Sequence, residues 1–340
     1  INSDNNTVQG NYIGTDISGA LDRGNHSDDG VELQNGASGN QIGGSAAGEG
    51  NLISGNQGAG IYVTGAGTVA NIIQGNLLGT NAAGTAAIQN GSNNIDINQG
   101  ATNTLVGGSA PGAGNTIAFS GNDGVSIWSW NTTGTIVQGN YIGTDATGAL
   151  DLGNTNNGIV ISGDSVNNLI GGTGAGEGNI IAFNDADGVR IHDNGTQDNT
   201  VLANTIYSNA HSGIDLANNG VSSNDVGDAD SGPNSLQNFP NLTQYDLAGT
   251  DLTVSGTLDT DGLNTQYRIE FYGNAFGDQD PTHGEGSVFL GSTVVTTNGS
   301  GDATFTGVVL SGVTLSVGDY VTATATRIIT PGLIGTDDLN

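Results

Sequence analysis

The sequence predicts an all-β protein: a right-handed parallel β-helix of about seven coils with three strands each, followed by a C-terminal β-sandwich. Landmarks recur every 64 residues through residues 1–217. Between them lie short segments with apolar residues at alternate positions, as in strands with one buried face. Gly or Asn interrupts every window before two helical turns can form, which disfavours a helical repeat. Each 64-residue unit is therefore expected to hold two coils.

Three landmarks carry this period. The tripeptide Gln-Gly-Asn begins at Gln9, Gln74 and Gln138, in steps of 65 and 64 residues. A Gly-Gly pair begins at Gly43, Gly107 and Gly171, and a Gly-Asn pair begins at Gly50, Gly114 and Gly178. Like segments therefore return at the distance of a coil and can stack in parallel, whereas an antiparallel sandwich would pair neighbouring segments through hairpins.

Each coil is expected to contribute three short strands with inward-facing apolar residues. The first strands are expected at 31–33, 61–63, 95–97, 125–127, 159–161, 189–191 and 214–216. The second strands are expected to bury Ile42, Ile73, Leu105, Val137, Ile170 and Val201. The third strands are expected to bury Ile13, Ile53, Leu78, Ile117, Ile142, Ile181 and Ile206. Stacked in register, these residues would form a narrow apolar core along the axis.

An asparagine precedes each third strand. The set is Asn11, Asn51, Asn76, Asn115, Asn140, Asn179 and Asn204. We interpret it as a structural ladder, in which inward-pointing amides hydrogen-bond to the neighbouring coil at a tight corner. Asn also tolerates the left-handed backbone that such corners need. These residues are expected to support the fold rather than catalysis.

The repeated elements Gln-Gly-Asn-Tyr-Ile-Gly-Thr-Asp (9–16 and 138–145) and Asn-x-Ile-Gly-Gly resemble those of right-handed parallel β-helix repeat proteins of bacterial cell surfaces. The stretch from Gly213 through Asp228 and Asp230 to Pro240 is similar to the usual exit from such helices. The resemblance covers nearly the whole chain and is specific for the fold. It implies no single function, because such proteins include polysaccharide lyases, hydrolases, epimerases, adhesins and passive stalks.

Past the repeats, residues 218–238 are predicted to form an acidic linker. Residues 239–329 contain alternating runs separated by Gly, Asn and Asp turns, which is typical of an immunoglobulin-like β-sandwich. A spacer, or a cap on the end of the β-helix, is the simplest role for such a domain. The tail, 330–340, contains Leu333-Ile334-Gly335-Thr336-Asp337, which repeats the Ile-Gly-Thr-Asp sequence of the third strand at 12–16. We hypothesise that it adds as a donor strand to the open first coil of another copy; the rival interpretation is that another coil starts there.

Composition excludes several functional classes. The chain carries 33 Asp and Glu against 4 Lys and Arg, a net charge of −29. Because phosphate binding needs several Lys or Arg side chains, we expect no nucleic-acid partner. The chain has no stretch of ~18 apolar residues, so no membrane insertion is predicted. Cysteine is absent, so disulfide and thiolate chemistry are excluded. Because the chain starts at Ile1 with no Met or signal segment, a processed or excised piece of a longer polypeptide is expected.

The outward face of the first strands is the candidate binding surface. It is expected to gather Tyr62, Trp128, Trp130, Arg190 and His192 as carbohydrate-binding residues. If the chain is catalytic, Arg190, His192 and Asp215 are the candidates, because Arg and His can meet uronate charge or move protons. The simpler interpretation is an ordinary strand surface, on which Arg190 and Asp215 form a stabilising cross-strand pair.

The acidic linker is the candidate metal site. Asp225, Asp228 and Asp230 lie close together in sequence, with Asp259, Asp261, Asp278 and Asp280 further along the chain. Clustered hard oxygen ligands suit Ca²⁺, although the spacing is not that of a complete EF-hand. A solvated acidic linker without any ion is the alternative.

Taken together, these patterns favour an extracellular structural or adhesive protein of a microbial surface or matrix. Its expected partners are other copies of itself, with which it would assemble head to tail into fibres, or other surface proteins. The alternative is a secreted polysaccharide-binding or polysaccharide-processing enzyme, a lyase or hydrolase, that uses the first-strand face. Ice binding would need a regular threonine array, and Thr15, Thr80 and Thr144 recur only in every second coil.

Overall fold

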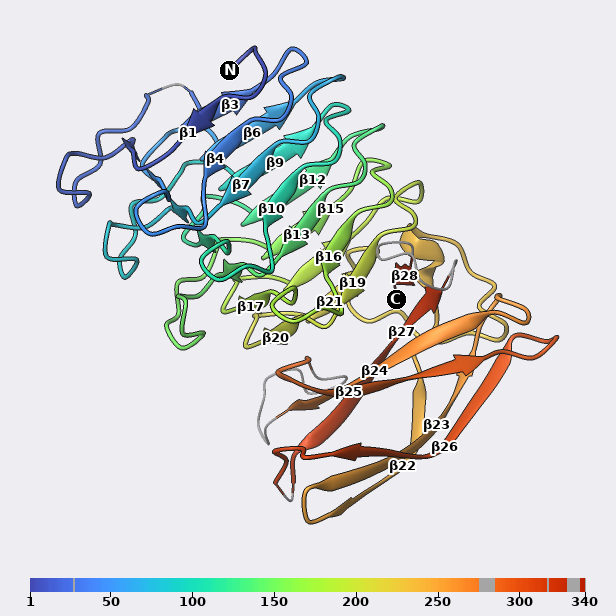
Figure 1. The fold of residues 1–340 in the computed structure, drawn as a ribbon. Helices are drawn as coiled ribbons and strands as arrows, with labels where there is room; N and C mark the ends of the chain where they lie inside the picture. The colour runs from blue at the N-terminus through green and yellow to red at the C-terminus, as the bar shows by residue number, and fades with distance from the viewer. Residues whose placement is uncertain (27, 275–284, 317, 329–336, 340) are drawn as a thin grey trace.

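The computed structural model describes residues 1–340 except 27, 275–284, 317, 329–336 and 340, and gives only the backbone of 337–339. The chain is an elongated stack of coils, with antiparallel sheets packed against the end formed by the last coil (Figure 1). Within the described ranges, the single helix is the short 3-10 helix η1 (Pro233–Leu236). No helix in this part of the chain is long and apolar enough to cross a membrane.

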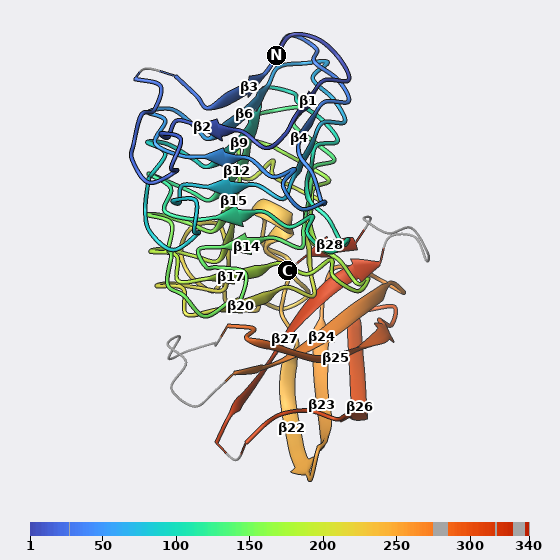
Figure 2. The same ribbon diagram turned by 60° about the vertical axis from the view of Figure 1, so that its left-hand side comes forward.

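Three parallel sheets of seven strands each form a parallel β-helix (Figure 2). Sheet 1 contains β3 (Val31–Leu33), β6 (Ile61–Thr64), β9 (Ile95–Asn98), β12 (Val125–Trp128), β15 (Ile159–Ile161), β18 (Val189–Ile191) and β21 (Ile214–Leu216). Sheet 2 contains β1 (Thr7–Val8), β4 (Gln41–Gly43), β7 (Ile72–Gln74), β10 (Leu105–Gly107), β13 (Ile136–Gln138), β16 (Leu169–Gly171) and β19 (Thr200–Leu202). Sheet 3 contains β2 (Tyr12–Ile13), β5 (Leu52–Ile53), β8 (Leu77–Leu78), β11 (Thr116–Ile117), β14 (Tyr141–Ile142), β17 (Ile180–Ala182) and β20 (Thr205–Tyr207). The predicted fold of about seven coils with three strands each is confirmed.

The core is a narrow apolar column inside the three sheets. Successive coils stack their apolar residues in register, so that in sheet 3 Ile117 lies between Leu78 and Ile142. One predicted core residue was wrong: Val106, not Leu105, lies between Ile73 and Val137 and is fully buried. The segment around it offers two adjacent apolar residues, and a shift of one residue turns the side chain to the other face of a strand.

Asparagine side chains link the coils at the corner before each strand of sheet 3. The backbone N–H and Nδ2 of each Asn donate to Oδ1 of the Asn in the next coil at 2.8–3.1 Å. This first ladder comprises Asn11, Asn51, Asn76, Asn115, Asn140, Asn179 and Asn204. All of its members except Asn11 are buried. The amides therefore satisfy backbone groups that would otherwise be orphaned inside the corner.

The other two corners carry similar ladders, which were not predicted from the sequence. Before sheet 2 the members are Asn6, Asn40, Asn71, Asn168 and Asn199, with Thr104 and Thr135 in the middle coils. Before sheet 1 the members are Asn56, Asn90, Asn154, Asn184 and Asn209, with Ser120 in the fourth coil. These positions are interrupted by Thr and Ser, which hides them in a search for a repeated tripeptide.

The two-coil period has a structural cause in the first ladder's corner. Gln74 and Gly107 occupy equivalent positions in successive coils, and Gln74 Nε2 donates to the Gly107 carbonyl at 2.8 Å. A Cβ on Gly107 would lie 2.0 Å from the Gln138 carbonyl oxygen of the following coil. Gln9 and Gln138 donate in the same way to the carbonyls of Gly43 and Gly171. Glycine is thus required by the close approach of the next coil's backbone, and the glutamine of the preceding coil binds the glycine carbonyl; in the last coil Leu202 takes the glutamine position.

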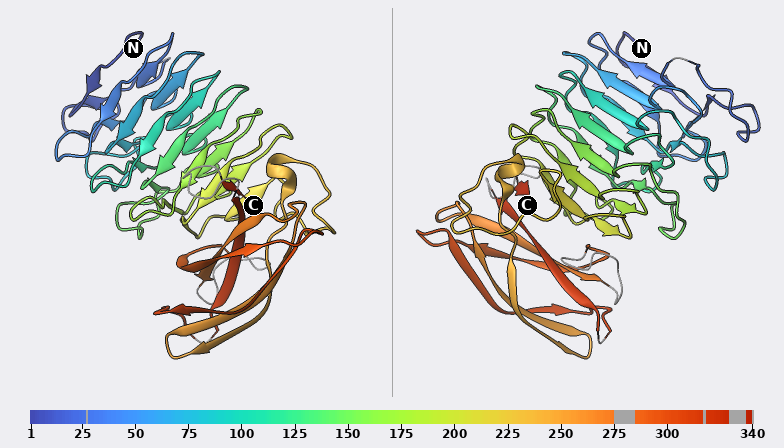
Figure 3. Two further views of the ribbon diagram at one scale, coloured as in Figure 1. Left: turned by 45° about the vertical axis from the view of Figure 1, so that its right-hand side comes forward. Right: turned by 180° about the vertical axis from the view of Figure 1, so that it is seen from behind.

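Two antiparallel sheets follow the last coil and share one apolar core, an arrangement compatible with a sandwich (Figure 3). One sheet has the order β22 (Asn241–Ala248), β23 (Asp251–Asp259) and β26 (Asp302–Ser311). The other has the order β25 (Val288–Thr296), β24 (Gln266–Asn274), β27 (Tyr320–Ile328) and β28 (Asp337–Leu339). Phe271 and Phe305 meet edge to face across the core, with ring centroids 5.7 Å apart. Most of the proposed donor strand lies outside the described residues, and residues 337–339 pair with β27 of their own chain.

The antiparallel sheets are hydrogen-bonded directly to the last coil. Ile206 and Gly286 exchange two backbone hydrogen bonds of 2.9 Å. Glu285 Oε1 accepts from both the N–H and Nδ2 of Asn209, in the position that an Asn of the next coil would take. Asn234, in η1, continues the ladder before sheet 2 by accepting from the Asn199 N–H. Side chains from beyond the β-helix thus extend two of its ladders by one step each.

Candidate functional site

The outer face of sheet 1 carries the predicted binding residues. The residue between the two inward-facing positions of each strand points outward, and parallel register places Tyr62, Asp96, Ser126, Val160, Arg190 and Asp215 in one row. Trp128 lies beside Asn98 two positions further along the strands. Polar and charged side chains from five different coils therefore lie along one face.

A groove of about 330 Å³ runs over the middle of this face. Its walls include three of the predicted residues, Trp128, Arg190 and His192. They also include two carboxylates, Asp96 and Asp123, and the amides of Asn93, Asn122, Asn156 and Asn157. Tyr62 lies next to Asp96 in register but is not among the lining residues. Trp130 and Asp215 are also outside the groove, and Trp130 is 72% exposed.

Asp96 holds Trp128 in a fixed orientation. Its Oδ1 accepts from Trp128 Nε1 and Asn98 Nδ2, and its Oδ2 accepts from Asn93 Nδ2, each at 2.8 Å. Burial raises the pKa of the Asp96 carboxyl, and the three donors oppose this shift. Trp128 nevertheless remains 38% exposed. The result is a rigid aromatic surface on the groove wall.

Asp123 belongs to a fourth ladder, made of Asp and Asn two residues before the strands of sheet 1. Its Oδ1 accepts from Nδ2 of Asn156 and from both the N–H and Nδ2 of Asn157. Burial raises the pKa of Asp123, against hydrogen bonds from Asn157 and the charge of Arg190. Other members are Asp29, Asn93, Asn157 and Asp187. An Asp or Asn recurs two residues before most strands of sheet 1, and this pattern in the sequence could have predicted the polar wall of the groove.

Arg190 pairs with Asp187 rather than with Asp215. Its Nη2 lies 2.6 Å and its Nε 2.8 Å from Asp187 Oδ2, and Asp187 is almost fully buried. Asp215 is the cross-strand register neighbour of Arg190, as predicted; burial raises the pKa of Asp215 and the charge of Arg190 opposes that shift, but the direct ion pair is with Asp187. The chain turns back after β21, and Asp215 accepts from the N–H groups of Asn219 and Gly220. Because Arg190 is paired with Asp187, its positive charge is already neutralised by a carboxylate at the groove. His192 Nδ1 lies 3.2 Å from Asp193 Oδ1.

The protonation of Asp96 can be followed through Trp128. The chain has two tryptophans, so Trp130→Phe leaves Trp128 as the only indole reporter. We expect its fluorescence to titrate with a midpoint above 3.8, because burial disfavours the carboxylate form of Asp96. For the same reason, ionisation of Asp96 as the pH rises through this raised pKa should disfavour the fold. Adding Asp96→Asn should abolish the transition, and a midpoint at or below 3.8 would contradict the assignment.

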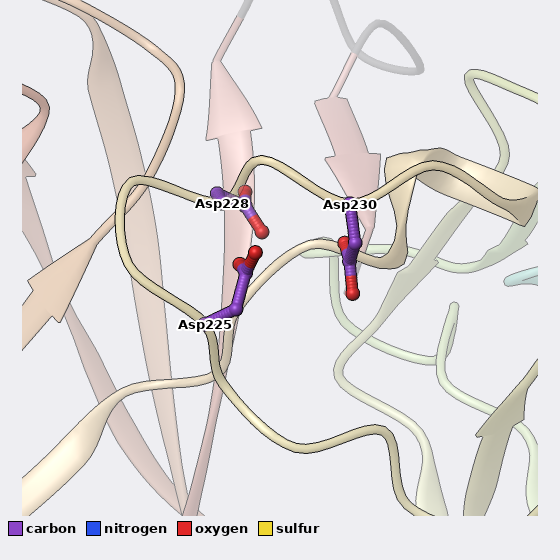
Figure 4. A group of neighbouring side chains, drawn as sticks. All are labelled: Asp225, Asp228 and Asp230. Carbon is purple, nitrogen blue, oxygen red and sulfur yellow. The ribbon is translucent and has the colours of Figure 1, made fainter.

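The three predicted metal ligands lie together in the loop between β21 and η1 (Figure 4). Carboxylate oxygens of Asp225, Asp228 and Asp230 lie within 4.8 Å of one another, so the cluster could hold a metal ion. Asp228 Oδ1 accepts from the Asn238 N–H at 2.8 Å, whereas its Oδ2 is buried without a hydrogen-bond partner. Burial, with the charges of Asp261, Asp230 and Asp225, raises the pKa of Asp228 to about 7.

The neighbours of this cluster are also acidic. Asp259 Oδ2, at the end of β23, accepts from the Gly227 N–H at 3.0 Å. Asp261 is close enough to raise the pKa of Asp228 by charge repulsion. The predicted acidic residues Asp278 and Asp280 lie outside the described residues. A positive ion at the three carboxylates would relieve this repulsion, and hard oxygen donors of this kind suit Ca²⁺ or Mg²⁺.

No protein-family model and no curated protein sequence matches this chain. Function is therefore inferred from the groove on sheet 1 and from the aspartate cluster.

Proposed function

We propose that this chain is an extracellular structural or adhesive protein that binds polysaccharide along the groove on sheet 1. The observation that carries this proposal is the fixed indole of Trp128, held by the buried Asp96 and still exposed on one side. Aromatic rings of this kind offer sugars a large apolar surface at little entropic cost, while amides and carboxylates bind their hydroxyl groups. The amides of Asn122 and Asn156 line the same groove.

The charges of the groove favour a neutral polysaccharide. Asp96, Asp123 and Asp187 bring three carboxylates to this face, and the guanidinium of Arg190 is paired with Asp187. A uronate chain would meet these carboxylates and the overall charge of −29. A neutral chain can donate its hydroxyl hydrogens to the same oxygens.

The proposal is tested by measuring the binding of neutral glucan or chitin chains, with alginate and pectate for comparison. We expect Trp128→Ala to weaken binding of a neutral chain by roughly tenfold or more, the loss typical of a central aromatic contact. Trp130→Ala is the matched control, because it removes an indole that lies outside the groove and should leave affinity nearly unchanged.

Equal affinity in Trp128→Ala and the parent chain would overturn the assignment of the groove. Preferential binding of alginate or pectate would overturn the preference for neutral chains, while leaving the site itself in place. Binding that Trp130→Ala removes and Trp128→Ala does not would move the site to the exposed loop after β12.

A polysaccharide-processing enzyme is the second candidate, favoured by the pair of carboxylates in the groove. Asp96 and Asp123 both have pKa values raised by burial, and a raised pKa lets one carboxyl act as a general acid while another activates water or attacks the sugar. The same binding mixtures would then accumulate reducing ends, and Asp123→Asn would stop this. A mixture without product after prolonged incubation supports binding alone.

The wider identity of the chain is also a proposal. A bacterial cell-surface type of β-helix protein accords with the repeated elements and the acidic composition. An immunoglobulin-like sandwich is supported by the strand order, with the first, second and fifth strands in one sheet and the third, fourth, sixth and seventh in the other. Association with other copies or other surface proteins is part of this proposal. Strand donation would require β28 to leave β27, and sedimentation at increasing concentration tests self-association.

For the aspartate cluster, we propose Ca²⁺ as the ion. Three carboxylates on a short loop accord with the variable oxygen coordination of Ca²⁺, whereas Mg²⁺ requires near-octahedral geometry and usually keeps several waters. An extracellular location would supply Ca²⁺ at the concentrations that weak extracellular sites use.

A further inference from the structure

The segment between the last coil and the antiparallel sheets is bonded to both. Asn234 accepts from Asn199 and so ends the ladder before sheet 2. Asn238 Nδ2 donates to the carbonyls of Asp225 and Asp259, at 2.8 and 2.9 Å. Asp225, Asp228 and Asp230 thus lie in a loop that Asn238 and Gly227 attach to the end of β23. Any change in this loop acts directly on the junction.

Apolar packing at the junction is incomplete. A cavity of about 330 Å³ lies between the last coil and the antiparallel sheets, with Ile214, Leu216 and Phe239 among its lining residues, together with Tyr272 and Val321. Contacts through Glu270, Glu285 and Gly286 cross this boundary, and they are hydrogen bonds. Hydrogen bonds therefore connect the two parts beside this cavity, and the aspartate loop lies at the same junction.

The cluster has an unused ligand atom. Asp228 is 5% exposed, and its Oδ2 is buried with no hydrogen-bond partner, while Figure 4 shows its carboxyl group turned toward that of Asp225. A buried carboxylate oxygen without a donor is costly unless a cation or a proton satisfies it. Asp259 and Asp261 add negative charge from the sheet side.

We propose that a Ca²⁺ ion bound by Asp225, Asp228 and Asp230 is a latch that holds the antiparallel sheets on the end of the β-helix. This inference rests on the calcium site proposed above and adds its role. With the ion bound, the loop is neutralised and keeps its bonds to Asn238 and Asp259. Without it, the carboxylates repel one another and the junction loosens, while the core of each part stays intact. Extracellular Ca²⁺ would then control the relative position of the two parts.

The experiment uses the full chain with CaCl₂, MgCl₂ or EDTA. Calorimetric titration measures binding of the metal, and differential scanning calorimetry with X-ray scattering measures the junction. We expect Ca²⁺ to raise the first unfolding midpoint by roughly 5 °C or more at concentrations well above Kd. Two separate transitions in EDTA should merge into one, and the radius of gyration should fall.

Asp228→Asn should lose both the binding and the calcium-dependent shift, and Asp225→Asn is a second variant in case the first fails to fold. Asp246→Asn, at an exposed position on β22, is the matched control and should respond like the parent chain. No calcium binding by the parent chain would overturn the site and the latch together. Binding with an unchanged scattering curve and unchanged transitions would overturn the latch alone, and an equal response to Mg²⁺ would overturn the choice of Ca²⁺.

Discussion

Replacing Asn140 with alanine is expected to lower the free energy of unfolding by about 3–5 kcal/mol, because several buried polar groups lose partners at once. Asn140 Oδ1 accepts from the N–H and Nδ2 of Asn115, and Asn140 Nδ2 donates to Asn179 Oδ1 and the Val106 carbonyl. Asn140 is 1% exposed, so water cannot replace these bonds without opening the corner. Denaturant unfolding followed by circular dichroism measures the loss.

Asn11→Ala supplies the matched control, since it makes the same substitution in the same ladder. Asn11 is exposed in the first coil and donates to Asn51 without accepting from an earlier Asn. Its loss should cost at most about 1 kcal/mol. If both variants lose similar stability, the ladder bonds are not what stabilises the interior coils.

The second large effect is expected from Gly107→Ala. Gly107 has φ +82°, and a Cβ there would lie 2.0 Å from the Gln138 carbonyl oxygen and 2.5 Å from Asn140 Oδ1. Both atoms belong to the next coil and take part in its hydrogen bonding, so neither can move away cheaply. We expect the coils around residue 107 to fail to stack, with a loss of roughly 4 kcal/mol or more. Soluble yield and thermal midpoint report the result.

Gly65→Ala separates backbone strain from the steric clash. Gly65 has φ +92°, and a Cβ there would meet no atom within 4 Å. Only the cost of a left-handed alanine remains, about 1–2 kcal/mol. Comparable losses in the two variants would mean that positive φ, rather than contact between coils, determines the glycine landmarks.

The groove illustrates which parts of a site can be predicted from sequence. Trp128, Arg190 and His192 could be assigned to one face because the strand period and the coil period together determine which side chains are neighbours. Asp123 was missed although Asp123 and Asp187 lie 64 residues apart, since it lies in the turn before a strand, where Asp is common and the direction of the side chain depends on the local backbone. The ion-pair partner of Arg190 could not be predicted. Asp187, three residues earlier, and Asp215, on the next coil, are equally plausible partners until the path of the chain after β21 is known.

The sequence by itself determined the β-helix, its approximate number of coils, the first asparagine ladder and the three acidic residues that cluster before η1. These features depend on local patterns repeated at a constant spacing, and repetition makes a short-range signal unambiguous. The same spacing also identifies Val106 rather than Leu105 as the core residue, because Ile42, Val106 and Ile170 lie 64 residues apart. Only the tertiary structure decided that Glu285 continues a ladder from a different part of the chain and that Asp228 Oδ2 is buried without a partner. Each of these depends on contacts between residues far apart in the chain, for which neither spacing nor composition carries a signal.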